Sequence, residues 1–104
     1  MAWFSFRSTK TPEPIDPQDA YTRGMQAWKD GSLDDAQTLL EQAASVEPTQ
    51  LKYVGNLGNF YHERKEWLAA LKCHRRVTEL DPTHAGALRN QGNALLELGR
   101  FIEA

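Results

Sequence analysis

The 104-residue sequence lacks the features that mark several large classes of protein. Its single cysteine, Cys73, excludes an intramolecular disulfide and fits a reducing compartment, so we expect a cytoplasmic location. No apolar run approaches the length that spans a bilayer. The net charge is -2, without the basic excess typical of nucleic-acid binders, so we expect no nucleic-acid partner.

Motifs of catalysis and metal binding are also missing. The sequence has no glycine-rich phosphate loop, nucleophile elbow or zinc-protease motif. Cys73 and His74 are adjacent, and on a helix they would point about 100° apart, which makes a shared metal ion difficult. No Cys-x-x-Cys or His-x-x-x-His pair adds His62 or His84 to a metal site. We therefore predict no enzyme activity, no metal and no cofactor.

Three kinds of small or rigid residue recur with one period. The same spacing in residue number separates successive members of three series. The first is Gly24, Gly58 and Gly92, the second is Ala36, Ala70 and Ala104, and the third is Pro48 and Pro82. A constant period of this size is typical of a stacked repeat array.

Capping and breaking residues divide each repeat into two helices. Asp16–Pro17 predicts an N-cap and first turn, and that helix should end near Lys29, before Asp30–Gly31. Ser32–Asp35 resembles a capping box that begins the second helix, which Glu47–Pro48 ends. Its expected inward face is Leu33, Ala36, Leu40 and Ala43.

The later boundaries are predicted from the same signals. Thr49 should cap a third helix, a break is expected at Arg64–Glu66, and a fourth helix should run from Trp67 to Asp81–Pro82. Thr83 should cap a fifth helix that ends at a Gly99–Arg100 turn. A sixth helix should then begin at residues 101–104.

The repeated glycines and alanines are predicted to lie where paired helices cross. Glycine within a helix costs about 1 kcal/mol relative to alanine. Three such glycines in register therefore indicate close packing, with Gly58 as an example on a first helix and Ala70 on a second.

These landmarks resemble the tetratricopeptide repeat (TPR). The matching pattern is Leu57-Gly58, Tyr61, Trp67, Ala70, Val77 and Asp81-Pro82, with partial copies on both sides. The resemblance implies an all-α, right-handed α-solenoid of helix-turn-helix repeats, about two and a half in number. The expected organisation is a flexible leader at 1–16 and a TPR domain at 17–104, made of repeats 17–50, 51–84 and a truncated 85–104.

Four positions depart from the family pattern. Arg23 and Gln91 stand where the second copy has Leu57, Lys65 where glycine is usual, and His74 where leucine or an aromatic residue is usual. We expect looser packing there within the same fold.

The resemblance also implies a function, which is binding of a partner's peptide or helix in a concave groove lined by the first helices. The predicted groove residues are Tyr21, Met25, Trp28, Lys52, Asn59, His62, Arg89, Asn93 and Leu96. Asparagine amides both donate and accept, so they suit an extended peptide backbone, and an arginine can pair a carboxylate. The alternative is that Asn59 and Asn93 simply face solvent.

A carboxylate-clamping TPR sub-family gives a more specific possibility. Asn59 and Asn90 resemble its asparagines, but Gly55 stands where its first lysine would be. A buried carboxylate needs a paired charge, so we do not expect this chain to be such a clamp.

Three other hypotheses remain open. The chain could be the N-terminal, substrate-presenting region of a longer glycosyltransferase, methyltransferase or sulfotransferase. Trp3, Phe4 and Phe6 could contact a membrane interface, or simply pack on the first helix or stay disordered. Residues 17–50 carry two basic and six acidic residues (-4) and 51–84 carry six and four (+2), which could steer a partner or only attract neighbouring repeats.

The third copy is predicted to leave an apolar surface. It has a first helix with only the start of a second, so Leu88, Leu95, Leu98, Phe101 and Ile102 would lack a cover. We expect the natural chain to continue, or this surface to self-associate.

Overall fold

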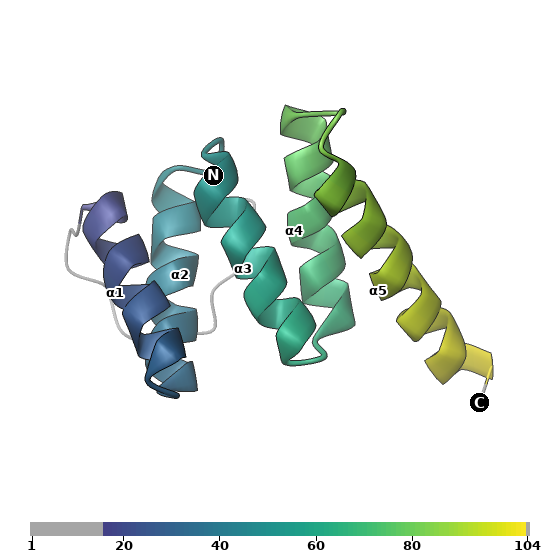
Figure 1. The fold of residues 1–104 in the computed structure, drawn as a ribbon, viewed down its shortest axis with the longest axis horizontal. Helices are drawn as coiled ribbons and strands as arrows, with labels where there is room; N and C mark the ends of the chain where they lie inside the picture. The colour runs from purple at the N-terminus through teal and green to yellow at the C-terminus, as the bar shows by residue number, and fades with distance from the viewer. Residues whose placement is uncertain (1–15, 104) are drawn as a thin grey trace. The chain divides into compact units, whose positions relative to one another are not determined.

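A computed structural model describes residues 16–103, with side chains described for 16–100. It contains five α-helices and, within those residues, no strand (Figure 1). The helices are α1 (Pro17–Lys29), α2 (Leu33–Val46), α3 (Leu51–Glu63), α4 (Trp67–Leu80) and α5 (Ala85–Glu103). The all-α fold and the ends predicted for the first helix are thereby confirmed. The predictions for Trp3, Phe4 and Phe6 in the leader lie outside the described residues.

Side-chain caps agree with the sequence at one helix and differ at the next. The backbone N–H of Asp19 donates to Oδ2 of Asp16 at 3.0 Å, with Pro17 in the first turn, as predicted. Ser32 precedes α2 but makes no side-chain cap bond, so the capping-box prediction is wrong. The reason is backbone geometry, because Ser32 has ψ of 74° whereas Asp16 has the extended ψ of 127°.

The third and fifth helices begin later than their predicted caps. α3 begins at Leu51, so the residue directly before this helix is Gln50 and not Thr49. The cap of α5 is His84, whose Nδ1 accepts from the backbone N–H of Ala87 at 3.0 Å. Thr83 instead donates its hydroxyl to Oδ1 of Asp81 at 2.7 Å, so both threonine predictions are wrong.

The chain consists of two compact units, Met1–Tyr53 and Val54–Ala104, with the boundary inside α3. In the first unit α1 packs closely on α2, because a Cβ atom on Gly24 would lie 3.0 Å from Cγ of Leu40. Ala36, Leu40 and Ala43 are buried, as predicted. Leu33 is 38% exposed, against prediction, because it begins α2 beside an exposed turn.

In the second unit α4 lies between α3 and α5 (Figure 1). A Cβ atom on Gly58 of α3 would lie 3.0 Å from Cβ of Cys73 on α4. Ala87 and Ala94 of α5 are buried. The polar departure at Gln91 is accommodated by hydrogen bonds, since its Nε2 donates to the His74 carbonyl at 3.3 Å and to Oγ1 of Thr78 at 3.0 Å.

The two helical hairpins turn at residues with left-handed backbone. Gly31 has φ of 82° and Lys65 has φ of 62°, and these two residues occupy equivalent positions of successive repeats. Gly99 is the next in the series, yet α5 continues through it to Glu103, so the predicted Gly99–Arg100 turn and sixth helix are wrong. Side chains of α2 pack against Gly24, and side chains of α4 pack against Gly58. By contrast, no described atom outside α5 lies within 4 Å of a Cβ placed on Gly92. Without such packing, local helix propensity extends α5.

The uncovered side of α5 carries large apolar residues. Leu88, Leu95 and Leu96 are 53%, 49% and 64% exposed, which agrees with the expected lack of a cover for Leu88 and Leu95. Leu98 is half-buried, against that expectation, and the side chains of Phe101 and Ile102 lie outside those that the structure describes. Self-association through this surface stays a prediction. None of the described helices combines the length and hydropathy needed to traverse a membrane.

Candidate functional site

The predicted groove residues all lie on α1, α3 and α5, and some of them make side-chain contacts within their own unit. In the first unit, one set of residues is joined by side-chain contacts, and we call it the tyrosine–lysine surface. It consists of Gln18, Tyr21, Lys52 and Tyr53. In the second unit, Asn59, Arg89, Asn90 and Asn93 from α3 and α5 form the asparagine surface.

Two stacked tyrosines and one lysine make up most of the tyrosine–lysine surface. The ring centroids of Tyr21 and Tyr53 are 5.1 Å apart with an interplanar angle of 36°. Nζ of Lys52 lies 5.1 Å from the Tyr21 centroid and 5.7 Å from the Tyr53 centroid. An ammonium group at this distance is attracted to the negative faces of both rings, which holds the exposed lysine in place.

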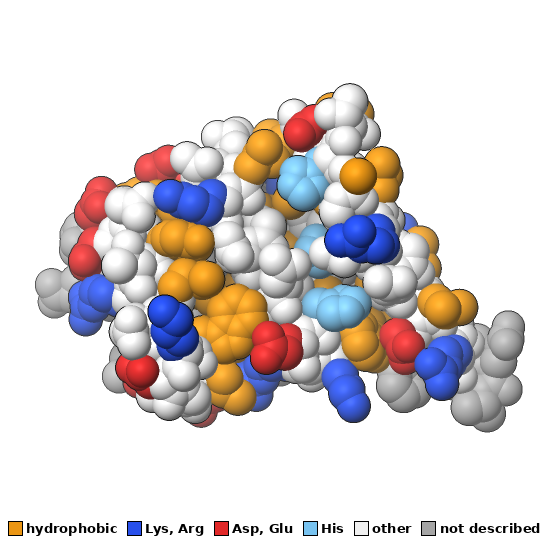
Figure 2. Space-filling model, viewed as in Figure 1, with side chains coloured by type: hydrophobic (Ala, Val, Ile, Leu, Met, Phe, Trp, Pro, Cys, Tyr) orange, Lys and Arg blue, Asp and Glu red, His pale blue; other side chains and the backbone are white. Residues whose placement is uncertain are grey.

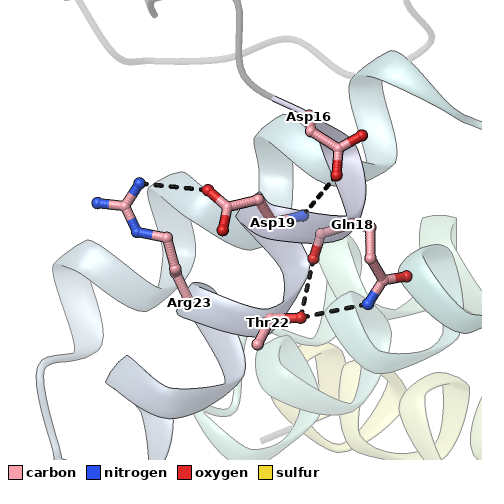
Figure 3. A network of polar contacts seen from close by, with 5 residues as sticks. All are labelled: Asp16, Gln18, Asp19, Thr22 and Arg23. Atoms are coloured by element: carbon pink, nitrogen blue, oxygen red, sulfur yellow. Dashed lines mark hydrogen bonds and ion pairs between the residues drawn. The ribbon is translucent and has the colours of Figure 1, made fainter.

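Gln18 connects these side chains to α1. Its Oε1 accepts hydrogen bonds from Nζ of Lys52 at 3.3 Å and from Oη of Tyr53 at 3.1 Å. Its Nε2 donates to Oγ1 of Thr22 at 3.2 Å, and the Thr22 hydroxyl donates to the Gln18 carbonyl at 2.9 Å (Figure 3). Because Nε2 is used by Thr22, the amide oxygen is the atom turned toward Lys52 and Tyr53.

Burial and nearby acidic residues favour the neutral form of Tyr53. Burial raises the pKa of this phenol first, and Glu47, Asp16 and Tyr21 raise it further. Tyr53 therefore remains a hydrogen-bond donor at neutral pH, as its bond to Gln18 requires. Lys52 adds a positive charge beside the two aromatic rings, with the carboxylates of Glu47 and Asp16 close enough to act on Tyr53.

The asparagine surface is organised by a contact between two amides. Nδ2 of Asn90 on α5 donates to Oδ1 of Asn59 on α3 at 3.4 Å. Asn59, Asn93 and Arg89 are exposed, and Asn90 is half-buried. The contact uses neither the NH₂ group of Asn59 nor the carbonyl oxygen of Asn90, and these are a donor and an acceptor of the kind that an extended peptide backbone needs.

The remaining predicted groove residues have different surroundings. Leu96 is exposed on α5, and Met25 and Trp28 are half-buried on α1. The ring of His62 packs edge-on against Trp67 at 5.0 Å with an angle of 79°, and its Nδ1 is buried without a hydrogen-bond partner. The structure thus joins Tyr21 to Lys52, and it places His62 against the following helix.

Two residues of the tyrosine–lysine surface were missed by the sequence analysis. Gln18 had a usable signal, because it lies one repeat length before Lys52 and so occupies the same place in its repeat. Tyr53 had none, since its repeat counterparts Asp19 and Ala87 are unrelated in chemistry. Among the described residues no group of three or more His, Cys, Asp or Glu side chains is placed to hold a metal ion.

Comparisons with known proteins identify the fold. No protein-family model and no curated protein matches the sequence. Among solved structures, MamA from MSR-1 matches with a TM-score of 0.75 and 29% identity over 86% of this chain and 51% of that chain. MamA from AMB-1 gives a TM-score of 0.76 and 29% identity over 86% and 49%. The chain spans about half the length of these MamA chains.

Two further solved structures are described as TPR domains. The Arabidopsis OM64 TPR domain matches with a TM-score of 0.71 and 20% identity over 84% of this chain and 72% of that chain. The first TPR of Spaghetti (RPAP3), bound to the HSP90 peptide SRMEEVD, matches with a TM-score of 0.70 and 21% identity over 86% and 73%. These matches give no support to the alternative that the repeats belong to an enzyme. With five helices in the described residues and TPR domains among its structural neighbours, this chain has the tetratricopeptide-repeat fold.

Proposed function

We propose that the chain is a protein-interaction module, a scaffold or adaptor, that binds a peptide or helix of a partner protein. The contact between Asn59 and Asn90 is the observation that carries this proposal. It joins the side-chain amides of α3 and α5, and the exposed Asn93 and Arg89 lie on the same helix as Asn90. Such a pair can bond to one peptide unit of any sequence, so it supplies affinity through the partner's main chain.

Positive charge on the two surfaces adds a preference for the partner's side chains. Lys52 on the tyrosine–lysine surface and Arg89 on the asparagine surface both favour acidic groups. The Spaghetti (RPAP3) TPR binds an HSP90 peptide that contains acidic residues, which supports a peptide ligand for the present chain. Gly55 carries no charge where the carboxylate-clamping sub-family has a lysine, so we propose internal acidic segments as ligands.

A peptide selection tests the proposal while the natural partner is unidentified. Peptides would be selected from a random display library on the full chain, and their affinities measured by fluorescence anisotropy. The variant Asn59→Ala/Asn93→Ala should bind the selected peptides about 30-fold more weakly, since each of the two lost hydrogen bonds contributes about 1 kcal/mol. Its melting temperature should be nearly unchanged because both residues are exposed.

Lys72→Ala is the matched control, because Lys72 is an exposed polar residue on α4, outside both surfaces. It should leave peptide affinity unchanged. The proposal is wrong if no peptide is selected, or if the selected peptides bind the double variant as tightly as the wild type.

The other predictions for partners and location are not changed by these findings. A cytoplasmic location and the absence of a nucleic-acid partner stay predictions, and membrane contact of Trp3, Phe4 and Phe6 stays one of the open alternatives.

A further inference from the structure

A histidine occupies a leucine position in the core of the second unit. His74 on α4 lies one repeat length after Leu40 on α2, and both side chains are buried against a glycine of the preceding helix. His74 is 2% exposed, and it is the one polar or charged side chain that is fully buried among the described residues. The two units therefore have matching helix crossings that differ in one titratable group.

The contact between His74 and α3 leaves little freedom for the imidazole. A Cβ atom on Gly58 would lie 2.8 Å from Cε1 and 3.0 Å from Nε2 of His74, so the ring faces the α3 backbone directly. Nε2 is buried and has no hydrogen-bond partner. The backbone carbonyl of His74 accepts from Gln91 of α5, which ties this residue to the third helix of the unit.

The titratable groups that act on this ring are bases from the elements packed around α4. They are His62 on α3 and His84 at the start of α5. Figure 2 shows the histidine side chains gathered on one face of the second unit. Burial, followed by the effects of His62 and His84, lowers the pKa of His74 to about 4, and an interaction with the Gly58 backbone, the smallest of these effects, opposes this shift.

A proton on this imidazole would place a positive charge in a space that offers it poor compensation. The imidazolium would have a second N–H at Nε2, directed at the α3 backbone where no acceptor is in hydrogen-bond geometry. A buried charge without a partner is strongly unfavourable, and the nearest relief is hydration of the ring. Hydration requires α3 to move away from α4 at Gly58.

We propose that the His74–Gly58 contact is an acid-sensitive contact, whose protonation separates α3 from α4 while the α1–α2 pair stays closed. The first unit has Leu40 at the same crossing, which does not titrate. Asn59 follows Gly58 directly on α3, so opening would also displace the asparagine surface. The inference rests on the core of the second unit and is independent of the peptide-binding proposal.

Hydrogen exchange at the level of single residues tests this difference between the units. Protection factors for residues 54–80 and for residues 17–46 would be measured in the wild-type chain between pH 7 and pH 4, corrected for intrinsic exchange. Protection in 54–80 should fall by up to about 10-fold per pH unit below about pH 6.5, the slope for uptake of one proton. Protection in 17–46 should fall less.

His74→Leu, which copies Leu40, should remove the additional acid response of residues 54–80. His84→Asn is the control, because asparagine keeps an N-cap acceptor for α5 while a neighbouring histidine is removed. This control should retain the response. If His74→Leu fails to fold, the wild-type His74 ring can be followed by NMR, where its titration should coincide with loss of protection in 54–80.

The proposal is overturned if both units lose protection in parallel, or if His74→Leu keeps the wild-type acid response. It is also overturned if the wild-type ring titrates while residues 54–80 remain protected.

Discussion

The backbone of Gly58 lies against the imidazole of His74, so closely that a Cβ atom at position 58 would be 2.8 Å from Cε1 of the ring. Contacts of real Cβ atoms are essentially never below 3.0 Å, so a side chain at position 58 requires the helices to shift. The close approach explains why glycine is present in the middle of α3 despite its low helix propensity. Gly92 has the same place in its repeat and no such neighbour among the described residues.

This contrast predicts opposite effects of one substitution at two equivalent positions. Gly58→Ala should destabilise the chain by about 1–3 kcal/mol, since overpacking outweighs the gain in helix propensity. Gly92→Ala should stabilise it by up to about 1 kcal/mol, because only the propensity term remains. Urea unfolding followed by circular dichroism measures both. Equal effects at the two positions would show that the close approach at Gly58 has no energetic importance.

Stability should also depend on pH through His74. Its pKa is lowered to about 4 in the folded chain, below the ordinary value of 6.5. Between these values the unfolded chain binds a proton that the folded chain does not, so the free energy of unfolding rises with pH. Acidification from pH 6.5 to pH 4 should therefore cost about 3 kcal/mol, with little further loss from this group below pH 4.

Unfolding free energies of the wild type and His74→Leu at several pH values between 4 and 7 measure this contribution. As the pH falls, the free energy of unfolding of His74→Leu should rise relative to that of the wild type. Parallel curves would mean that His74 titrates equally in the folded and unfolded chains.

The sequence predicted the repeat and most helix ends because the signals there are local. Gly31 lies in the turn of the first hairpin, and a proline follows the second helix and the fourth helix, one repeat length apart. Threonine is a common capping residue, so the sequence predicts Thr83 as the cap of α5. The structure uses His84, since the choice depends on which side chain reaches the backbone N–H of Ala87.

The candidate site was predicted by repeat position but not by contact. The positions of Lys52 and Asn59 within their repeat predict that both lie on a first helix. These positions could not predict that Gln18 accepts from both Lys52 and Tyr53, because that depends on side-chain reach between segments one repeat apart. In the sequence, His74 is a departure from the family pattern. Its unsatisfied Nε2 became visible only with the α3 backbone in place.

The two capping residues of the first unit give a matched pair of substitutions. Asp16→Ala should destabilise α1 by about 1 kcal/mol, because the Asp19 N–H loses its acceptor. Ser32→Ala should change stability by less than about 0.5 kcal/mol, since Ser32 makes no side-chain cap bond. Thermal unfolding compares them directly. A loss at Ser32 as large as that at Asp16 would restore the capping box that the sequence suggested.

The hairpin turns provide the last prediction, which compares three equivalent positions of successive repeats. Lys65 has φ of 62°, a conformation that costs residues with a Cβ atom about 1–2 kcal/mol. Lys65→Gly should therefore stabilise the chain by about 1 kcal/mol, partly offset by the greater freedom of glycine in the unfolded state. Lys65→Ala keeps the Cβ atom and should be close to neutral, which separates the backbone effect from loss of the lysine side chain.

The same reasoning predicts opposite effects of alanine substitution on stability at the two glycines of the series. Gly31 has φ of 82° and no atom within 4 Å of an added Cβ, so Gly31→Ala should be destabilising through backbone strain alone. Gly99 lies within α5 and also has open space around it, so Gly99→Ala should stabilise the helix by about 1 kcal/mol. Unfolding of the three variants decides the matter. If Gly99→Ala is destabilising like Gly31→Ala, then residue 99 turns the chain in solution and α5 ends there, as the repeat pattern first suggested.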